Sequence, residues 1–251
     1  PYAAPPVGDL RWKPPQPVAP WTGVRQCTQF GPASMQLFPR LPVGVSEDCL
    51  FLNVYTPAKM ASGRLPVMVF FHGGSNYRGA ASQWNGTLLA QQGVVVVTVN
   101  YRLGPLGWLA HPLLSQESPN KVSGNYGLLD DVAALKWVQT NIAAFGGDPG
   151  NVTIFGESAG GCAVINLMAS PLAKGLFQRA ITHSGPADYV HSSVDAEKQG
   201  VAFVSGLGVS GAPDVLKALR AKSAEEIIAA AGESMGVGAG RAKNFESKDV
   251  V

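Results

Sequence analysis

The residues with the clearest chemical potential surround Ser158, within Gly156-Glu157-Ser158-Ala159-Gly160. A short apolar run at residues 152–155 precedes this G-x-S-x-G pattern, and an apolar helical stretch follows it. A strand, a sharp turn and a helix in that order lift a serine hydroxyl clear of a sheet. Gly156 and Gly160 suit such a turn, because a side chain there would collide with the neighbouring strand or helix. The pattern predicts a nucleophilic serine with an oxyanion forming near the start of the helix.

A second glycine-rich segment, Phe71-His72-Gly73-Gly74-Ser75-Asn76, could supply backbone donors for that oxyanion. It follows residues 66–71, an apolar run typical of a central parallel strand. Hydrolases with a G-x-S-x-G serine place their second donor loop after such a strand. Gly73 would give the loop its conformational freedom, and His72 is expected to orient the loop rather than act as a base. The candidate donors are the backbone amides of Gly74, Ser75 and Ala159.

A nucleophilic serine of this kind also needs an acid and a histidine, which follow it in the order Ser, Asp or Glu, His. Only His183 and His191 follow Ser158, and Asp188 is the only acid between Ser158 and His191. Asp188 and His191 are three residues apart, whereas hydrolases with a G-x-S-x-G serine take the acid and the histidine from the ends of two different strands. His183 ends a predicted strand and is expected to be structural. The chain therefore contains a nucleophile and oxyanion donors without a complete triad.

The elements that would position these residues alternate along the chain. Apolar runs predict strands at residues 50–56, 66–71, 94–99, 152–155 and 180–183. Helical patterns occur at residues 88–92, 125–144, 158–168, 196–205, 213–221 and 224–231. Strands that alternate with helices predict an α/β fold with a mainly parallel, doubly wound sheet, and the last three helices are expected outside it. The proline-rich residues 1–20 are predicted to be extended.

The chain also contains two longer motifs. One runs from Phe145-Gly146-Gly147 through Val152-x-Ile154 to Ser158, and the other is Glu47-Asp48-Cys49-Leu50-Phe51-Leu52-Asn53-Val54-Tyr55-x-Pro57. Both resemble the signatures of the type-B carboxylesterase/cholinesterase family, with the character of a bacterial-type carboxylesterase. The resemblance implies an α/β-hydrolase fold, no cofactor, and a serine carboxylic-ester hydrolase that forms an acyl-enzyme with a small-molecule ester.

The resemblance also concerns the extent of the domain. It implies that residues 1–251 are the N-terminal portion of a single α/β-hydrolase domain with no internal boundary. The triad acid and histidine would then lie beyond residue 251, and residues 1–251 alone would be inactive.

Two predictions about pairing come from the same resemblance. The family pairs Cys49 with an upstream cysteine, and Cys27 is the one available, so a Cys27–Cys49 disulfide is expected. Such a bridge indicates an oxidising compartment, and hence a secreted or periplasmic protein. Cys162 is expected to be a small buried core residue. The resemblance also implies two structural ion pairs, Arg11 with Glu47 and Arg102 with Asp130.

Two positions near the site have less certain roles in the family pattern. Glu157 is typical beside the nucleophile, where it either tunes the field around the histidine or satisfies a buried hydrogen bond. The family usually has Gly-Gly-Gly-Phe where this chain has Gly73-Gly74-Ser75-Asn76. The amide of Ser75 can therefore act as a donor only if position 75 holds a backbone conformation open to a side chain.

Other functions of the same family fit the sequence as alternatives. One is a non-catalytic adhesion or binding protein, although retention of Ser158 argues against it. Another is a lipase or sterol esterase, which would need a large apolar lid or acyl groove. Choline esters are disfavoured, because residues 28–48 contain no tryptophan on which a quaternary ammonium could stack.

Composition excludes several other classes. A chain of 251 residues with 46% hydrophobic and 14% charged residues suits one globular α/β domain. A formal charge of +2, with no run of five like charges, predicts no nucleic-acid partner. The longest apolar run, residues 94–99, is too short to span a membrane. Three cysteines and four scattered histidines predict no metal site. The sequence does not predict an oligomeric state.

Overall fold

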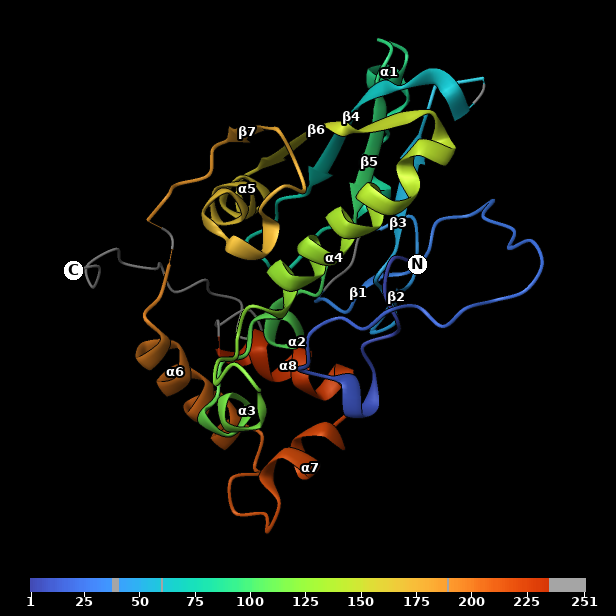
Figure 1. Ribbon diagram of the computed structural model, residues 1–251. Coiled ribbons are helices and arrows are strands. Elements are labelled where there is room, and N and C mark those ends of the chain that lie inside the picture. The colour runs from blue at the N-terminus through green and yellow to red at the C-terminus, as the bar shows by residue number, and fades with distance from the viewer. Residues whose placement is uncertain (38–40, 60, 189, 235–251) are drawn as a thin grey trace.

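The computed structural model describes residues 1–37, 41–59, 61–188 and 190–234 (Figure 1). Its main sheet has five strands in the order β3-β5-β4-β6-β7. Strand β3 is antiparallel to β5, and the other neighbours are parallel, so the predicted mainly parallel sheet is confirmed. The strands are β3 Leu52–Tyr55, β4 Leu65–Phe71, β5 Val95–Val99, β6 Gly147–Glu157 and β7 Arg179–His183.

The central strands form where the sequence is apolar on both faces. All five residues of β5 are buried, and four of them are valine, whose branched side chain suits a pleated surface covered on both sides. The register pairs Phe71 with both Val99 and Gly156, and Glu157 with His183. The parallel strands therefore end at one edge of the sheet, where the segments after β4, β5, β6 and β7 meet.

Helices α4 (Tyr126–Asn141) and α5 (Ala159–Ala169) pack beside the sheet (Figure 1). Val132 and Leu135 of α4 lie in the main core with the strand residues. The helix predicted over residues 125–144 ends in the 3-10 turn η4 (Ile142–Phe145). Gly146 follows with φ 80, a left-handed conformation that ends helices at little cost in glycine.

A second group of helices lies beyond the carboxyl ends of β4 and β5 (Figure 1). It has its own apolar cluster, which includes the fully buried Leu219 and Ile227 and the ring of Trp12. The three C-terminal helices were predicted outside the sheet, and this is confirmed, whereas α2 and α3 were not predicted. The members are α2 Gly104–Trp108, α3 Pro112–Glu117, α6 Ser193–Gly206, α7 Val215–Arg220 and α8 Ala224–Ser234.

The remaining elements are short. They are η1 Gly8–Leu10, β1 Ala33–Ser34, β2 Val45–Ser46, η2 Ala61–Gly63, η3 Ala81–Gln83, α1 Thr87–Ala90 and η5 Pro171–Ala173. The single turn of η1 is the exception to the extended conformation predicted for residues 1–20. No helix in the described ranges is both long enough and apolar enough to cross a bilayer.

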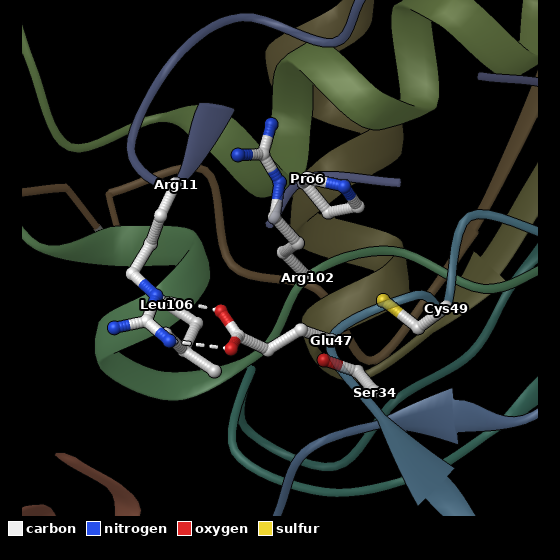
Figure 2. A pocket seen from close by; sticks show the side chains of 7 residues that line it. All are labelled: Pro6, Arg11, Ser34, Glu47, Cys49, Arg102 and Leu106. Carbon is white, nitrogen blue, oxygen red and sulfur yellow. Dashed lines mark hydrogen bonds and ion pairs between the residues drawn. The ribbon is translucent and has the colours of Figure 1, made fainter. Parts of the chain in front are cut away.

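Both predicted ion pairs are confirmed. Arg102 contacts Asp130 through two hydrogen bonds of 2.8 Å, and both side chains are buried. Arg11 binds Glu47 with its Nε and Nη2 at 2.7 and 2.5 Å, and its Nη1 donates to two carbonyls at the end of α7. Figure 2 shows the Arg11–Glu47 pair and Arg102 lining one pocket. Arg11 thus connects the N-terminal segment to Glu47 and to the second helix group, and Arg102 connects the segment after β5 to α4.

The predicted Cys27–Cys49 disulfide is wrong, because all three cysteines are free. Cys49 has no exposed surface and packs in the main core, where burial raises the pKa of its thiol to about 12. Cys27 is exposed, and its thiol donates to the carbonyl of Arg25. A bond between them would require one of these segments to move. Cys162 is buried, as predicted.

Candidate active site

Ser158 lies between the end of β6 and the start of α5, in the predicted order of strand, turn and helix. Its backbone has φ 54 and ψ −121, a combination that costs a non-glycine residue about 1–3 kcal/mol. Hydrogen bonds on both sides hold this conformation. The Ser158 amide donates to the carbonyl of His183 at 2.8 Å, and its carbonyl accepts from the amide of Cys162 at 2.9 Å.

The glycines flanking Ser158 are required by close contacts. A Cβ added at Gly156 would lie 2.3 Å from the carbonyl oxygen of Gly160. A Cβ added at Gly160 would lie 2.0 Å from the carbonyl oxygen of Phe71, at the end of β4. The predicted collisions with strand and helix are therefore confirmed, and the first turn of α5 sits directly on β4.

The segment after β4, residues 72–79, is here called the glycine loop, and it lies against the Ser158 turn. A Cβ added at Gly73 would be 2.8 Å from the carbonyl oxygen of Glu157 and 3.2 Å from the Cβ of Ser158. Gly74 has φ 112, and a Cβ there would be 2.1 Å from the carbonyl oxygen of Arg78. The loop folds back on itself, since the Arg78 amide donates to the carbonyl of Gly74.

The next two loop residues also have left-handed backbone. Ser75 has φ 55 and Asn76 has φ 59, so position 75 does hold a conformation that a side chain tolerates at a cost. Within residues 1–37, 41–59, 61–188 and 190–234, the amides of Gly74, Ser75 and Ala159 donate no hydrogen bond. The Ala159 amide is the first of α5, where the helix dipole adds positive potential.

His72 is buried at the start of the glycine loop. Its Nδ1 donates to the carbonyl of Gly73 at 2.8 Å. Burial lowers the pKa of His72 to about 4, and the hydrogen bond to Gly73 opposes this only partly. The ring is therefore neutral near pH 7, and its one N–H group donates a hydrogen bond to the loop. This agrees with an orienting role.

Comparison with known proteins identifies the family. Residues 1–248 match the description "Carboxylesterase family". The chain belongs to this family. It is similar to a para-nitrobenzyl esterase of Bacillus subtilis (strain 168), with 47% identity over 240 residues that cover 92% of this chain and 47% of that protein. It is also similar to a fumonisin B1 esterase of Sphingopyxis macrogoltabida, with 55% identity over 191 residues that cover 73% of this chain and 35% of that protein.

The fold agrees with a solved member of the carboxylesterase family. A carboxylesterase of Geobacillus stearothermophilus superposes with a TM-score of 0.85 and 42% sequence identity, covering 95% of this chain and 49% of that chain. The predicted α/β-hydrolase fold is thereby confirmed. The chain spans less than half the length of each of these three relatives.

Among the described residues, no side-chain hydrogen bond joins an acid or a histidine to the Ser158 hydroxyl. His183 contributes its backbone carbonyl to the Ser158 amide, and its side chain is exposed. His191 and Asp188 are exposed in the segment after β7. Glu157 is exposed, and its carboxylate lies beside Gly73, 2.7 Å from where a Cβ would be.

Two residues near the site were not predicted from the sequence. The hydroxyl of Tyr101 donates to the carbonyl of His72 at 2.6 Å, and the two rings stack with centroids 4.5 Å apart. Gln36 bonds both backbone groups of Gly79. Both contacts join residues far apart in sequence. The only local signal was the position of Tyr101 directly after a predicted central strand, at the same edge as Ser158.

The pocket in Figure 2 is separate from this site. Its lining consists of Pro6, Arg11, Ser34, Glu47, Cys49, Arg102 and Leu106, and does not include Ser158. It has no room for a water molecule, so it is a packing defect around the ion pairs. In the part of the chain that the structure describes, no three His, Cys, Asp or Glu residues are grouped to hold a metal ion.

Proposed function

We propose that the intact protein carrying this chain is a serine carboxylic-ester hydrolase with Ser158 as nucleophile. The oxyanion hole would consist of the amides of Gly74, Ser75 and Ala159, supported by Gly73 and Glu157. The observation that carries the proposal is the strained backbone of Ser158, with φ 54 and ψ −121, at the junction of β6 and α5. Such strain persists only where the surroundings impose it, and it is concentrated at functional sites.

Three free amides beside the turn support the proposed oxyanion hole. The amides of Gly74, Ser75 and Ala159 have no partner within the described residues, so they are available to an oxygen that becomes negative. Each donor of this kind contributes about 3–4 kcal/mol to the transition state. Membership of the carboxylesterase family supports the reaction class.

The mechanism follows from these groups. The Ser158 oxygen attacks the ester carbonyl carbon while a general base takes its proton. The carbonyl oxygen becomes an oxyanion, which the three amides stabilise. The intermediate collapses, the alcohol leaves with the proton returned by the base, and the acyl group remains on Ser158. Water then attacks the acyl-enzyme by the same route and releases the acid.

The general base and its acid are proposed to come from sequence beyond residue 251, in the same α/β-hydrolase domain. This is supported by the order Ser, Asp or Glu, His in such hydrolases, and by the 47% of the Bacillus subtilis relative that this chain covers. Residues 1–251 alone are then expected to be inactive, because Ser158 would have no base.

The substrate is proposed to be a small-molecule carboxylic ester. Fumonisin B1 and para-nitrobenzyl esters are the first to test, because the similar proteins are named for these compounds. A secreted or periplasmic location is also proposed, although the free cysteines remove the disulfide argument for it. Activity recovered outside the cytoplasm would support that location, and purely cytosolic activity would contradict it.

Labelling of the intact protein by a para-nitrophenyl phosphonate tests the nucleophile. Wild type should be labelled at one serine, and Ser158→Ala should lose both labelling and hydrolysis by at least ~10⁴-fold. Ser184→Ala is the matched control, because Ser184 also follows a strand of this sheet and has φ 52. It should keep full activity. Absence of labelling in the folded wild type would favour a non-catalytic binding protein instead.

A further inference from the structure

The glycine loop lies beside Ser158, yet its own hydrogen bonds would not fix it in place. Three consecutive residues, Gly74, Ser75 and Asn76, have φ of 112, 55 and 59. Two of them are not glycine, so relaxed alternatives with negative φ exist for this segment. The contacts that select the observed conformation must therefore come from outside the loop.

The first anchor is Tyr101, just after β5. Its side chain is fully buried, its hydroxyl donates to the carbonyl of His72 at 2.6 Å, and its ring stacks on the imidazole at an interplanar angle of 19°. The same carbonyl lies 3.0 Å from where a Cβ of Gly160 would be. Tyr101 thus fixes the beginning of the loop against the first turn of α5.

The second anchor is Gln36, from the segment after β1. Its amide is buried and closes a two-way pair with Gly79, in which Nε2 donates to the carbonyl at 3.0 Å and Oε1 accepts from the amide at 2.9 Å. Nε2 also donates to the carbonyl of Ser34 at 2.9 Å, which holds the Gln36 side chain itself. Gln36 thus fixes the end of the loop.

We propose that Tyr101 and Gln36 are positioning residues that hold the glycine loop in its donor conformation before substrate binds. The inference rests on the proposed function, in which Gly74 and Ser75 lie on that loop and donate to the oxyanion. Between the two anchors, the amide of Gly104 donates to the carbonyl of Asn76 at 2.7 Å, so the strained stretch is held at both ends and at its middle.

Holding the glycine loop in place should stabilise the transition state more than the bound substrate. Amides that are held in advance cost no reorganisation when charge develops, and a small displacement weakens them for the oxyanion more than for the neutral ester. Loss of an anchor should therefore lower kcat and the affinity for an oxyanion analogue, while KM changes little.

Tyr101→Phe in the intact protein tests the first anchor, with Tyr2→Phe as the matched control. The hydroxyl of Tyr2 also donates to a backbone carbonyl, that of Asn100, at 2.6 Å, and Tyr2 is also buried. Both variants lose one buried hydrogen bond and should lower Tm by a similar amount. Only Tyr101→Phe should lower kcat, by about 10-fold, which is less than the loss of a whole donor.

Gln36→Met tests the second anchor, with Gln139→Met as its control. Gln139 is partly buried and also donates twice to backbone carbonyls, those of Pro149 and Leu176, away from the glycine loop. Gln36→Met should lower kcat by about 10-fold and weaken binding of a trifluoromethyl ketone by the same factor. Gln139→Met should change neither. Since both anchors act on one loop, the double variant with Tyr101→Phe should lose less than the product of the two effects.

The outcomes separate this inference from the proposed function. An inactive, unlabelled wild type would overturn the function itself. An active wild type in which Tyr101→Phe and Tyr2→Phe have equal kcat would overturn the inference alone, as would a rise in KM at constant kcat. The inference would be supported if Tyr101→Phe and Gln36→Met had the same Tm values as their control variants but lower kcat values.

Discussion

Two regions of the chain hold its longest motifs, and they are built by different means. In the elbow region, which is Ser158 with the glycine loop at residues 72–79, five residues have positive φ, and several amides lack partners among the described residues. In the ion-pair region, which is Arg11, Glu47, Arg102 and Asp130, no residue has positive φ and the carboxylates bind guanidinium groups. The first region leaves backbone donors available, whereas in the second each carboxylate is paired with a guanidinium.

The difference separates a chemical role from a structural one. Buried neighbours such as Tyr101 and Gln36 maintain the strained backbone of the elbow region. The region gains little stability from its own hydrogen bonds. In the ion-pair region, Arg11 joins the N-terminal segment to the end of α7, and Arg102 joins the segment after β5 to α4. Changes in the ion-pair region should therefore alter stability, and changes in the elbow region should alter chemistry as well.

The largest expected effect is that of Arg102→Met. Asp130 is fully buried, so removal of the guanidinium leaves its carboxylate with only the backbone amide of residue 102 as a donor, which costs about 3–5 kcal/mol. The free energy of unfolding, measured by urea denaturation, should fall by that amount. Arg64→Met is the control, because Arg64 is 80% exposed in its pair with Asp148 and should cost less than ~1 kcal/mol.

The activity of Arg102→Met tests whether the two regions are separate. Activity of the intact Arg102→Met protein, expressed per folded molecule, should match wild type. A fall in kcat as large as that expected for Tyr101→Phe would mean that the ion-pair region also positions the glycine loop, and the two regions would not be separate.

The second effect is a loss of stability in acid that originates at His72. Burial lowers the pKa of His72 to about 4, below its ordinary value of 6.5, so the unfolded chain takes up the proton first. The stability that His72 contributes is complete above pH 6.5 and is lost as pH falls towards 4. The difference between these pKa values corresponds to about 3 kcal/mol.

Urea denaturation between pH 7 and pH 4 measures this effect. The decline in the free energy of unfolding should be shallower in His72→Gln than in wild type. His191→Gln removes an exposed histidine and should leave the decline unchanged. Equal slopes in wild type and His72→Gln would show that the elbow region has no buried neutral imidazole.

Much of the fold could be predicted from local sequence. The valines of β5 predict a strand that is covered on both faces, and Gly156 and Gly160 could be assigned because a tight turn excludes side chains. Helices α2 and α3 could not be predicted. Each has only five or six residues with a proline in its first turn, and α2 depends on a distant contact, the bond from the Trp12 indole to the carbonyl of Pro105.

The candidate site divides in the same way. Ser158 and the glycine loop were found because their requirements are local, a turn and a φ range. Tyr101 and Gln36 were missed because their partners are 29 and 43 residues away, and a tyrosine or glutamine has no sequence pattern that specifies a distant carbonyl. The disulfide prediction was wrong for a related reason, since it came from the family resemblance, which does not specify how this chain buries its own cysteines.

The smallest expected effect is that of Ser75→Gly, and it has the opposite sign. Ser75 has φ 55, where an L-residue pays about 1–2 kcal/mol and glycine pays nothing. Part of this gain is offset, because glycine loses more conformational entropy on folding than serine does. The free energy of unfolding should therefore rise by about 0.5–1 kcal/mol. Ser118→Gly, at φ −66, has no strain to relieve and should lower it by a similar amount.

These two substitutions compare the same chemical change in left-handed and ordinary backbone. Thermal or urea unfolding of both variants should give shifts of opposite sign, while kcat of Ser75→Gly stays within a few-fold of wild type because Tyr101 and Gln36 still hold the loop. Destabilisation of Ser75→Gly to the same extent as Ser118→Gly would contradict stored strain at position 75. The elbow region would then differ from the ion-pair region only in its unpaired amides, and the anchors would have no strained segment to hold.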